Sequence, residues 1–592
     1  IIRVIIQVIV FILFQPERHL NIKNWEDQTL NSNVWAANIM DRLSPKEVIG
    51  IVLQPLEMVS ETLERKLGLF SVVILSLSAM LGSGLFVLPS LAMMELGDGN
   101  SPLGGIWLAY LFAGLVILPG AISKSELASA MPSSGGAYVY IEKTFGPIIG
   151  TISGLGLWAN FMLKSAFALI GFKAYLWVLE GILDVSINLD YAVMIMLGLI
   201  VGINILGAKS IKKVQTPVVL VSVTYLMIVC IYALLTMELN WDAAISRQAF
   251  GADWHSFSST AALVFVSYIG VTKVAAVGGE IKDPSKNMPY GILISLFFSV
   301  FLYVFVTLTM AITVDPLSYV ENGHAREDPI YVFALIVGGK TIATIAATFA
   351  AVTVLSGSLA GIMAASRFLF AMARANLLPE LFENVHSKYE TPHWAIIGTG
   401  LSMAGAIIFL PVHDVAELAS GFNLMVFILI NACVLVLRNS AKSHWYKPEW
   451  KSPLYPFTQI FGILAGSILI YAMGVKALFG GSAAVIIGII IYQSYGKSHG
   501  HKSITPWETF RLQLTNPDEV EHRRRWAAFH AADTDRNNNL NLHEFISAME
   551  SLGFSDGNQD TLREYFHAAD DNEDGVLEID EFLLGVEELE FD

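Results

Sequence analysis

Long apolar stretches recur between residues 66 and 496 of this chain, and they constrain its fold more than any other feature. A helix of about 20 apolar residues spans the hydrocarbon core of a bilayer. Twelve stretches suit this length, at approximately residues 68–93, 104–123, 148–182, 189–207, 215–237, 257–279, 289–314, 341–372, 394–411, 416–437, 456–475 and 477–495. With only 15% charged residues, the chain is also too apolar for a soluble globular protein. The sequence therefore predicts an all-α, polytopic membrane protein with twelve transmembrane helices.

The lysines and arginines of the connecting loops predict the orientation of these helices, because such residues accumulate on the cytoplasmic side. One set of alternate loops is rich in them: Arg65, Lys66, Lys124, Lys143, Lys209, Lys212, Lys213, Lys282, Lys286, Arg374, Lys388, Arg438, Lys442, Lys447 and Lys451. The other set holds little more than Arg247, Arg326, Lys340 and Lys476. Both termini are therefore expected in the cytoplasm, and the protein in the plasma membrane.

Glycine interrupts the first apolar stretch at Gly82-Ser83-Gly84. In hydrocarbon, an unpaired backbone group costs several kcal/mol, so a helix broken at this depth persists only where the freed groups line a cavity and meet a ligand. A second interruption, residues 267–272, falls in the sixth stretch, five after the first. Paired breaks at this interval predict two five-helix inverted repeats with discontinuous helices 1 and 6. The alternative explanation is that these glycines permit close helix packing.

Acidic residues concentrate in the last part of the chain. Residues 497–592 hold 22 Asp and Glu against 8 Lys and Arg, which is a net charge of −14 out of −16. We expect four parts: a cytoplasmic leader at 1–65, the helix bundle at 66–496, a linker at 497–517 and a soluble helical domain at 518–592. The apolar segment 1–14 of the leader is too short to span a bilayer and is expected to form an interfacial or bundle-packed helix.

Two twelve-residue segments of the soluble domain, 533–544 and 570–581, fit the calcium-binding loop of an EF-hand. Oxygen ligands occupy positions one, three and five, a backbone carbonyl position seven, and a glutamate position twelve. The predicted Ca²⁺ ligands are Asp533, Asp535, Asn537, Asn539, Asn541, Glu544, Asp570, Asn572, Asp574, Val576, Glu578 and Glu581. Asn538 replaces the usual glycine at position six of the first loop, where asparagine adopts a left-handed conformation at modest cost. The sequence therefore predicts an EF-hand pair.

Short sequence motifs follow one another through the predicted bundle in a characteristic order. They are LGSGLFVLP at 81–89, SEL at 125–127, PSSGGAYVY at 132–140, FGP at 145–147, EIKDP at 280–284, NMP at 287–289, ASR at 365–367, AMAR at 371–374, LP at 378–379 and TP at 391–392. In order and spacing, these motifs resemble those of the amino acid–polyamine–organocation transporter superfamily. The resemblance covers about residues 66–496, and it implies a leucine-transporter-like core.

The resemblance implies a site for an amino acid at the first break. The Ser83 hydroxyl and the Gly84 N–H would hold the substrate carboxylate, and the carbonyls of Met80, Val266 and Ile269 would receive the α-amino group. Elementary physics supports the carboxylate site, because a half-helix beginning near Gly84 would present N–H groups and the positive end of its dipole to an anion.

The second break is expected to set the selectivity of this site. Gly82 and Gly270 belong to the two interruptions and are included among the substrate-binding residues. Tyr268 is placed to close over the substrate as an aromatic gate. Thr272 stands where some members of the superfamily carry a glutamate, so this contact is uncharged and favours a substrate with a neutral side chain.

Six further residues are candidates for coupling or gating: Glu126, Lys164, Lys273, Glu280, Ser356 and Ser358. Each also has a plain structural explanation. The lysines can snorkel or form salt bridges, as between Lys273 and Glu280, and the glutamates can cap helices or latch an inner gate. The serines can contact a sodium ion, although bonding to the backbone of their own helix is favoured. The fifth stretch contains no Lys or Arg, so coupling through a lysine there is not supported.

The resemblance implies secondary active transport of an amino acid by alternating access, driven by H⁺ or Na⁺, with a cytoplasmic Ca²⁺-sensing tail. No enzyme signature competes with this interpretation. Two alternatives remain open: an amino-acid-sensing membrane receptor, and a transporter of polyamines, other organic cations or inorganic ions with chloride. The expected partners are the amino acid, the lipid membrane and Ca²⁺, without nucleic acid. The acidic tail is expected to dock on the basic cytoplasmic loops of the bundle.

Overall fold

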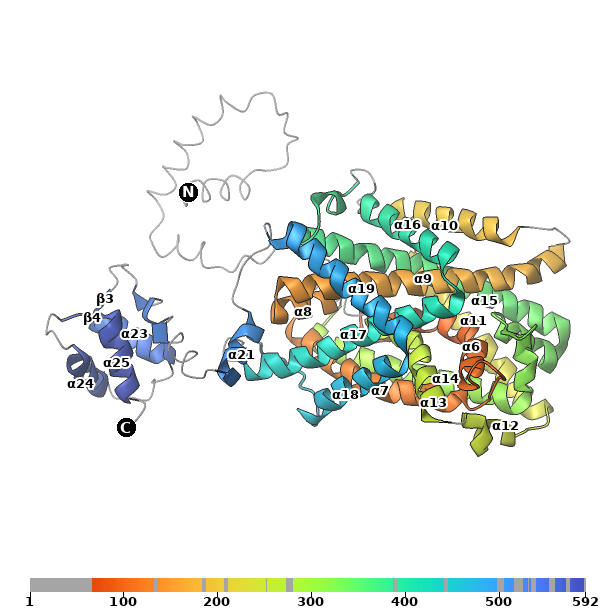
Figure 1. The fold of residues 1–592 in the computed structure, drawn as a ribbon, viewed down its shortest axis with the longest axis horizontal. Coiled ribbons are helices and arrows are strands. Elements are labelled where there is room, and N and C mark those ends of the chain that lie inside the picture. Colours follow the sequence, from red (N-terminus) through yellow and green to blue (C-terminus); the bar gives the residue numbers. More distant parts are fainter. Residues whose placement is uncertain are drawn as a thin grey trace, which may run out of the picture. The chain divides into compact units, whose positions relative to one another are not determined.

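The computed structural model describes the chain from residue 67 to residue 589 (Figure 1). Gaps in this description fall at residues 133–135, 184–187, 207–210, 252, 273–280, 387–388, 390, 441–445, 498–504, 516–524, 527, 531, 534–538, 553–558 and 571–574. The predicted leader at 1–65, with its apolar segment 1–14, lies outside the described residues. Helices dominate the described part, and each of its strands has only two residues.

The first half of the bundle starts with a helix that is broken twice. Its elements are α4 (Leu69–Met80), α5 (Ser83–Phe86), α6 (Leu88–Leu96), α7 (Ile106–Ala130), α8 (Ala137–Phe145), α9 (Pro147–Leu183), α10 (Leu189–Ile205), α11 (Ile211–Thr236), α12 (Asp242–Ile245), η2 (Arg247–Phe250), α13 (Trp254–Val264) and η3 (Phe265–Thr272). The last of these, η3, is a 3₁₀-helix that continues directly from α13.

The second half consists of longer helices joined by short elements. These are α14 (Pro284–Thr313), η5 (Pro316–Tyr319), β1 (Val320–Glu321), β2 (His324–Ala325), α15 (Pro329–Arg374), η6 (Glu380–Phe382), α16 (His393–Phe409), α17 (Val412–Asn439), α18 (Phe457–Ala472), α19 (Val475–Ile491) and η8 (Tyr492–Gly496). The strands β1 and β2 pair antiparallel in a small hairpin. Helix α15 is kinked at Gly339, where φ is 75°.

Helix α9 is central to the packing of the bundle. It packs against α15, α17, α8 and α19, and it runs alongside α15 for much of its length (Figure 1). Helix α7 packs against α14 and α17. One continuous cluster of buried apolar side chains connects these helices with the pieces of the broken helix.

The described helices support a multi-pass membrane protein. By length and composition, six are able to cross a membrane: α7, Pro147–Leu176 of α9, Pro217–Thr236 of α11, α14, α15 and α17. Shorter apolar helices cover Leu189–Ile205, His393–Phe409, Phe457–Ala472 and Gly481–Gly496. The predicted first and sixth spans are interrupted, and this division shortens their helical pieces. The number of twelve spans and the inverted repeat therefore stay predictions.

The first break has two separate points. Helix α4 ends at Met80, and Leu81 and Gly82 both leave the helical conformation. A second departure occurs at Val87, where φ is −124°. Pro89 follows two residues later, and because proline has no N–H it cannot donate to the carbonyl four residues before it. Proline chemistry thus separates α5 from α6, a division that the glycines alone did not predict.

The second break takes a different form. The predicted interruption at 267–272 lies inside η3, so the chain here tightens into a 3₁₀-helix and does not become extended. Hydrogen bonds in such a helix have poorer geometry than those of an α-helix, and long runs of it often mark strained or functional positions. This 3₁₀-helix packs against α4, α7 and α17.

The tail contains a compact helical unit with its own apolar core. Its elements include β3 (Asn539–Leu540), α23 (Leu542–Leu552), α24 (Gln559–Ala569), β4 (Leu577–Glu578) and α25 (Ile579–Leu589). Strands β3 and β4 pair antiparallel, with Leu540 opposite Leu577. These leucines occupy position eight of the two predicted calcium loops, so the structure aligns the loops in the same register as the sequence pattern.

A separate helix, α21 (Pro506–Thr515), lies within the predicted linker and packs against α8 and α17 of the bundle. The ring of Trp507 contacts that of Phe145 at the end of α8, with 5.7 Å between centroids. A Cβ on Gly146 would lie only 2.9 Å from the side chain of Thr505. The linker is therefore attached to the bundle.

Adding a methyl group at Gly270 is expected to destabilise the protein. Its Cβ would lie 2.4 Å from the backbone N of Met80, and overpacking of this kind costs about 1–3 kcal/mol. Thermal unfolding of the purified protein should therefore show a lower Tm for Gly270→Ala. The matched control is Gly405→Ala in α16, where a Cβ meets no atom within 4 Å. Equal Tm values for the two variants would contradict the close approach of η3 to α4.

Candidate functional site

The two breaks lie against each other. A Cβ on Gly84 would lie 2.5 Å from Oγ of Ser267, and the corresponding atom on Gly270 would overlap the backbone of Met80. These two glycines therefore let the backbones of the breaks approach closely. A Cβ on Gly82, by contrast, would meet no atom within 4 Å. Close packing explains Gly84 and Gly270, but it does not explain Gly82.

Two buried tyrosines satisfy carbonyl groups at the breaks. The Tyr110 hydroxyl of α7 donates to the Gly84 carbonyl at 2.9 Å. The Tyr303 hydroxyl of α14 lies 2.8 Å from the Met80 carbonyl and 3.2 Å from the Ser267 carbonyl, and so bridges the two breaks. The carbonyl of Met80, predicted to receive a substrate amino group, thus already accepts one hydrogen bond. Its second lone pair leaves room for another donor.

Tyr268 belongs to the same aromatic group. Its side chain is fully buried, its hydroxyl donates to the Tyr110 carbonyl at 2.8 Å, and its ring meets that of Tyr303 edge-on with 5.2 Å between centroids. Tyr110 and Tyr303 also stack on each other. The structure therefore places Tyr268 beside both breaks, and its role as a gate stays a prediction.

Within the described part of the chain, two N–H groups of the first break are free to bind a ligand. Leu85 and Phe86 donate to the Gly82 carbonyl at 3.0 Å each. Among the described residues, the N–H groups of Ser83 and Gly84 donate no hydrogen bond. A helix does begin at Ser83, next to Gly84, but α5 has only four residues and a turn at Val87 separates it from α6. Anion binding here would rest on individual N–H groups, with little help from a helix dipole.

A serine of helix α17 forms hydrogen bonds with backbone groups at the start of the second break. The Val266 N–H donates to Oγ of Ser420 at 2.9 Å, and the Ser420 hydroxyl donates to the Leu263 carbonyl at 2.8 Å. Ile269 is fully buried in the same 3₁₀-helix. One serine of a neighbouring helix thus serves two backbone groups at the junction of α13 and η3.

Lys164 of α9 reaches the first break from a neighbouring helix. Its Nζ donates to the Ala79 carbonyl at 3.0 Å, at the C-terminal end of α4. A cation is favourable at this end of a helix, because the carbonyl groups there carry partial negative charge. Ser358 of α15 donates to the Ser165 carbonyl of α9 at 3.1 Å, so the expectation that it bonds within its own helix is wrong. Ser356 is half-buried in the same helix.

Glu126 of α7 forms a buried ion pair with Arg438 of α17. Arg438 Nε lies 2.7 Å from one carboxylate oxygen, and its Nη2 lies 2.6 Å from the other. The Tyr446 hydroxyl and the Ser452 N–H also donate to this carboxylate, at 2.9 and 2.7 Å. Burial, together with the neighbouring carboxylate, raises the pKa of Tyr446, so its hydroxyl stays protonated and donates. Glu126 therefore holds α7, α17 and the following loop together.

The described parts of the calcium loops have the expected turn. Asp570, at position one of the second loop, accepts the N–H of Gly575 at 2.9 Å, and Gly575 adopts a φ of +82° at position six. Glu581, at position twelve, accepts the Glu578 N–H at 2.9 Å. In the first loop, Glu544 is buried. These contacts arrange the oxygen atoms at the two ends of each loop.

Several predicted residues cannot be placed from the structure. Outside the described part lie Lys273, Glu280, the side chain of Thr272, and the loop residues Asp535, Asn537, Asn538, Asn572 and Asp574. The suggested pairing of Lys273 with Glu280 therefore stays a prediction.

Sequence reasoning missed the residues that complete the site from other helices. Tyr110, Tyr303 and Ser420 occupy ordinary positions inside long apolar helices, and Arg438, expected only as a loop cation, lies in the last turn of α17. The only available signal was a polar side chain in an apolar segment, a pattern shared by many residues of this chain. Their partners are distant in sequence, so local patterns do not identify them.

Comparison with known protein families divides the chain as the motifs do. Residues 71–499 match the family model of amino acid permeases, and residues 562–585 match the EF-hand model. The first match covers most of the bundle, including both breaks. The second match covers the loop that begins at Asp570.

Individual relatives cover most of the same region. The chain is 28% identical over 460 residues to a branched-chain amino acid permease of Bacillus subtilis, which is 74% of this chain and 94% of the relative. It is equally similar to the methylthioribose transporter of that organism, with 74% and 95% covered. The serine/threonine exchanger of Bacillus subtilis is 26% identical over 416 residues, with 69% and 90% covered.

Breaking the ion pair of Glu126 is expected to lower stability strongly. Removal of one partner leaves the other charge uncompensated, and such changes cost about 3–5 kcal/mol. We expect Glu126→Gln and Arg438→Met each to reduce Tm, and the double variant to lose less than the sum of the two. Thermal unfolding in a double-mutant cycle measures this coupling. Additive effects would show that the two residues do not depend on each other.

Proposed function

The chain belongs to the amino acid permease family, and on this premise we propose that it carries an amino acid across a membrane by alternating access between the two sides. We further propose that the membrane is the plasma membrane, with both termini in the cytoplasm. Fifteen lysines and arginines in alternate loops support this orientation.

The observation that carries the proposal is the contact between the two breaks. The N–H groups of Ser83 and Gly84 donate no hydrogen bond in the described part of the chain, and the Ser83 side chain is nearly buried beside them. Carbonyl groups of Met80 and Ser267 lie on the other side of the same contact, joined by one tyrosine hydroxyl. Donors on one side and acceptors on the other suit a carboxylate and an ammonium group on neighbouring atoms.

A larger residue at Gly84 would not test this site alone. Its Cβ would displace Ser267, so the substitution disturbs the packing of the breaks as well as the proposed carboxylate contact. Ser83 offers a cleaner test, because its hydroxyl can be removed without adding atoms.

The aromatic group beside the breaks favours an uncharged substrate side chain. Tyr268 is buried beside the stacked rings of Tyr110 and Tyr303, and these three residues bring no formal charge to the site. Thr272 occupies the position where some relatives carry a glutamate. We propose a neutral amino acid as the substrate. The similarity to a methylthioribose transporter makes other small polar molecules necessary controls in the screen.

Lys164 is the strongest candidate for coupling. Its ammonium group is half-buried and bonds to the Ala79 carbonyl, one residue before the Met80 carbonyl that faces the second break. Loss of its proton would remove the cation from the end of α4 and change the stability of the break. We propose H⁺ as the coupling ion on this ground. Na⁺ remains the alternative, and uptake driven by a pH gradient or a Na⁺ gradient in proteoliposomes separates the two.

Purified protein in proteoliposomes provides the direct test of function. Net uptake of one of the twenty amino acids would support transport. A thermal shift with an amino acid but no uptake would favour the receptor alternative. Uptake of a polyamine, another organic cation, or chloride with inorganic ions would favour the other transporter classes.

The tail is proposed to sense Ca²⁺ and to act on the bundle through α21. This helix joins the bundle to the EF-hand pair and packs on α8 and α17. Trp507 rests on Phe145 at the end of α8, so movement of the tail can be transmitted to the helix that precedes α9. Calcium binding neutralises part of a net charge of −14 and changes the surface that the EF-hand pair presents.

Replacing Ser83 with alanine is expected to weaken substrate binding at least tenfold. A hydrogen bond to a charged group contributes about 1.5–3 kcal/mol, and about 1.4 kcal/mol corresponds to a factor of ten. The Kd of the transported amino acid, measured by thermal shift or calorimetry, checks this. Ser467→Ala is the matched control, because its exposed hydroxyl bonds only to the Ile463 carbonyl of its own helix. A wild-type Kd for Ser83→Ala would remove the hydroxyl from the site.

Uptake is expected to lose its calcium dependence when both calcium loops are disabled. The double variant Glu544→Gln and Glu581→Gln removes the glutamate at position twelve of each loop. Uptake in proteoliposomes, measured over a range of Ca²⁺ concentrations, should then be constant. Trp507→Ala should also abolish the response, although the protein still binds Ca²⁺.

The matched control for this prediction removes the same two charges from another surface. Glu380→Gln with Glu383→Gln alters exposed residues of the loop after α15, and it should keep the calcium response. Identical calcium curves for the wild type and the position-twelve variant would mean that the tail does not regulate uptake.

A further inference from the structure

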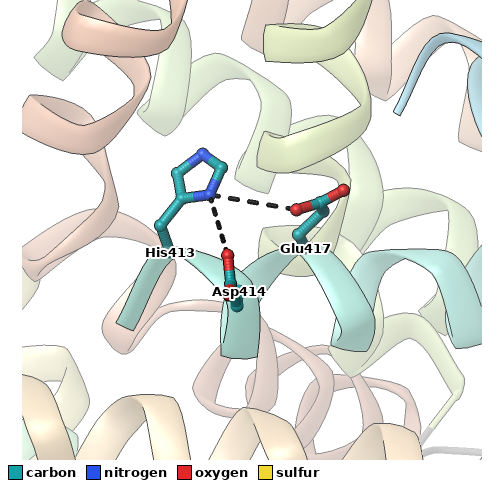
Figure 2. Close-up of side chains that lie close together, drawn as sticks. All are labelled: His413, Asp414 and Glu417. Carbon is teal, nitrogen blue, oxygen red and sulfur yellow. Dashed lines mark ion pairs between the residues drawn. The ribbon is translucent and has the colours of Figure 1, made fainter. Parts of the chain in front are cut away.

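Three metal-ligating side chains gather at the beginning of α17, outside the site described above (Figure 2). His413 Nδ1 lies 3.9 Å from Asp414 Oδ1 and 3.9 Å from Glu417 Oε2. One ligand atom from each of the three residues lies within 4.8 Å of the others. In a helix, positions four apart share a face, so the spacing of His413 and Glu417 brings their side chains together.

The other ring nitrogen of His413 is held by a different helix. Its Nε2 lies 3.1 Å from Oε2 of Glu95, at the end of α6. Glu95 is itself oriented by the Ser259 hydroxyl of α13, which donates to its other oxygen at 2.7 Å. A histidine that binds a metal usually donates its second ring N–H to a carboxylate in this way, which fixes the ring and its tautomer.

This arrangement turns the Nδ1 lone pair towards two carboxylates. With the proton on Nε2, Nδ1 has no hydrogen, and 3.9 Å is too long for a hydrogen bond in any case. A neutral ring would leave this lone pair facing two carboxylate oxygens that repel it, and either a second proton on the ring or a metal cation removes this repulsion. Ligand atoms about 2.0–2.2 Å from one Zn²⁺ ion lie about 3–4 Å from each other, so the two 3.9 Å separations from Nδ1 are at the upper end of this range and small side-chain rotations would close the site on an ion.

We propose that His413, Asp414 and Glu417 bind a transition-metal dication of the Zn²⁺ class, and that Glu95 orients the histidine. Imidazole nitrogen together with carboxylate oxygen suits such ions, whereas Ca²⁺ prefers a shell of oxygen atoms alone. The site is therefore chemically distinct from the calcium loops of the tail. Side-chain exposures of 36%, 22% and 10% leave it open to ions from one side.

The position of the site gives the ion a mechanical effect. Through Glu95, it connects α17 to α6, which is the last piece of the broken first helix. Helix α17 also supports the second break through Ser420. A bound ion strengthens the link between α6 and α17 and should slow uptake, a consequence that rests on the proposed function. In the predicted topology, this end of the bundle faces outside.

Zinc binding to the purified full chain tests the site without any transport measurement. Calorimetric titration with Zn²⁺, with Ca²⁺ in excess to occupy the tail, should show one ion in the wild type that is lost in His413→Ala and in Asp414→Asn. Glu95→Gln should keep this ion but weaken its affinity by about 10–100-fold, because it removes the orienting carboxylate. His567→Ala removes an exposed histidine of α24 in the tail and should change neither quantity.

Folding and transport are controlled separately. Each variant should still unfold cooperatively without Zn²⁺. Zn²⁺ should raise Tm in the wild type, in His567→Ala and, at higher concentration, in Glu95→Gln, but not in His413→Ala or Asp414→Asn. Equal zinc stoichiometry in the wild type and His413→Ala would overturn the site. Zinc binding as predicted, with uptake unaffected by Zn²⁺, would overturn the mechanical link. Zinc binding without uptake of any substrate would leave the site standing and refute the proposed function alone.

Discussion

Backbone groups freed inside an apolar bundle need partners, and this requirement governs the arrangement of the described helices. The first helix stops at Met80 and resumes at Ser83, while the sixth predicted span tightens into a 3₁₀-helix. Hydroxyl groups from α7, α14 and α17 satisfy most of the exposed positions. The N–H groups at Ser83 and Gly84 donate no hydrogen bond to another described residue. A ligand carboxylate at this break would supply acceptors for them.

Charged side chains near the ends of helices also have partners that compensate them. Lys164 contacts the carbonyl end of α4, and Glu126 joins Arg438 where α7 approaches the end of α17. Each charge therefore stands where backbone dipoles or an opposite charge compensate it. The Lys164 contact and the Glu126–Arg438 ion pair differ in the role that we expect for them. The first lies beside the proposed substrate and can respond to it, whereas the second binds two long helices and a loop into one unit.

Local chemistry determines how much was predictable from the sequence. Apolar stretches predicted the long helices, glycines predicted the first break, and ligand spacing predicted the register of Leu540 and Leu577. The helix that begins near Gly84 is shorter than predicted, because the chain turns at Val87 just before Pro89. Tyr303 and Arg438 could not be found, since their partners lie far away in the chain and only tertiary packing brings them together. The same reason explains Ser358, which bonds to another helix.

The strand pairing in the tail has a consequence for the shape of the proposed calcium response. Leu540 and Leu577 belong to different loops but share one hydrogen-bonded ladder, so the two loops cannot change conformation independently. An ion that orders one loop lowers the entropy lost when the second ion binds. Occupancy should consequently rise over a narrower range of Ca²⁺ concentration than for two separate sites. The ladder would make the tail respond steeply near one Ca²⁺ concentration and weakly to changes well above or below it.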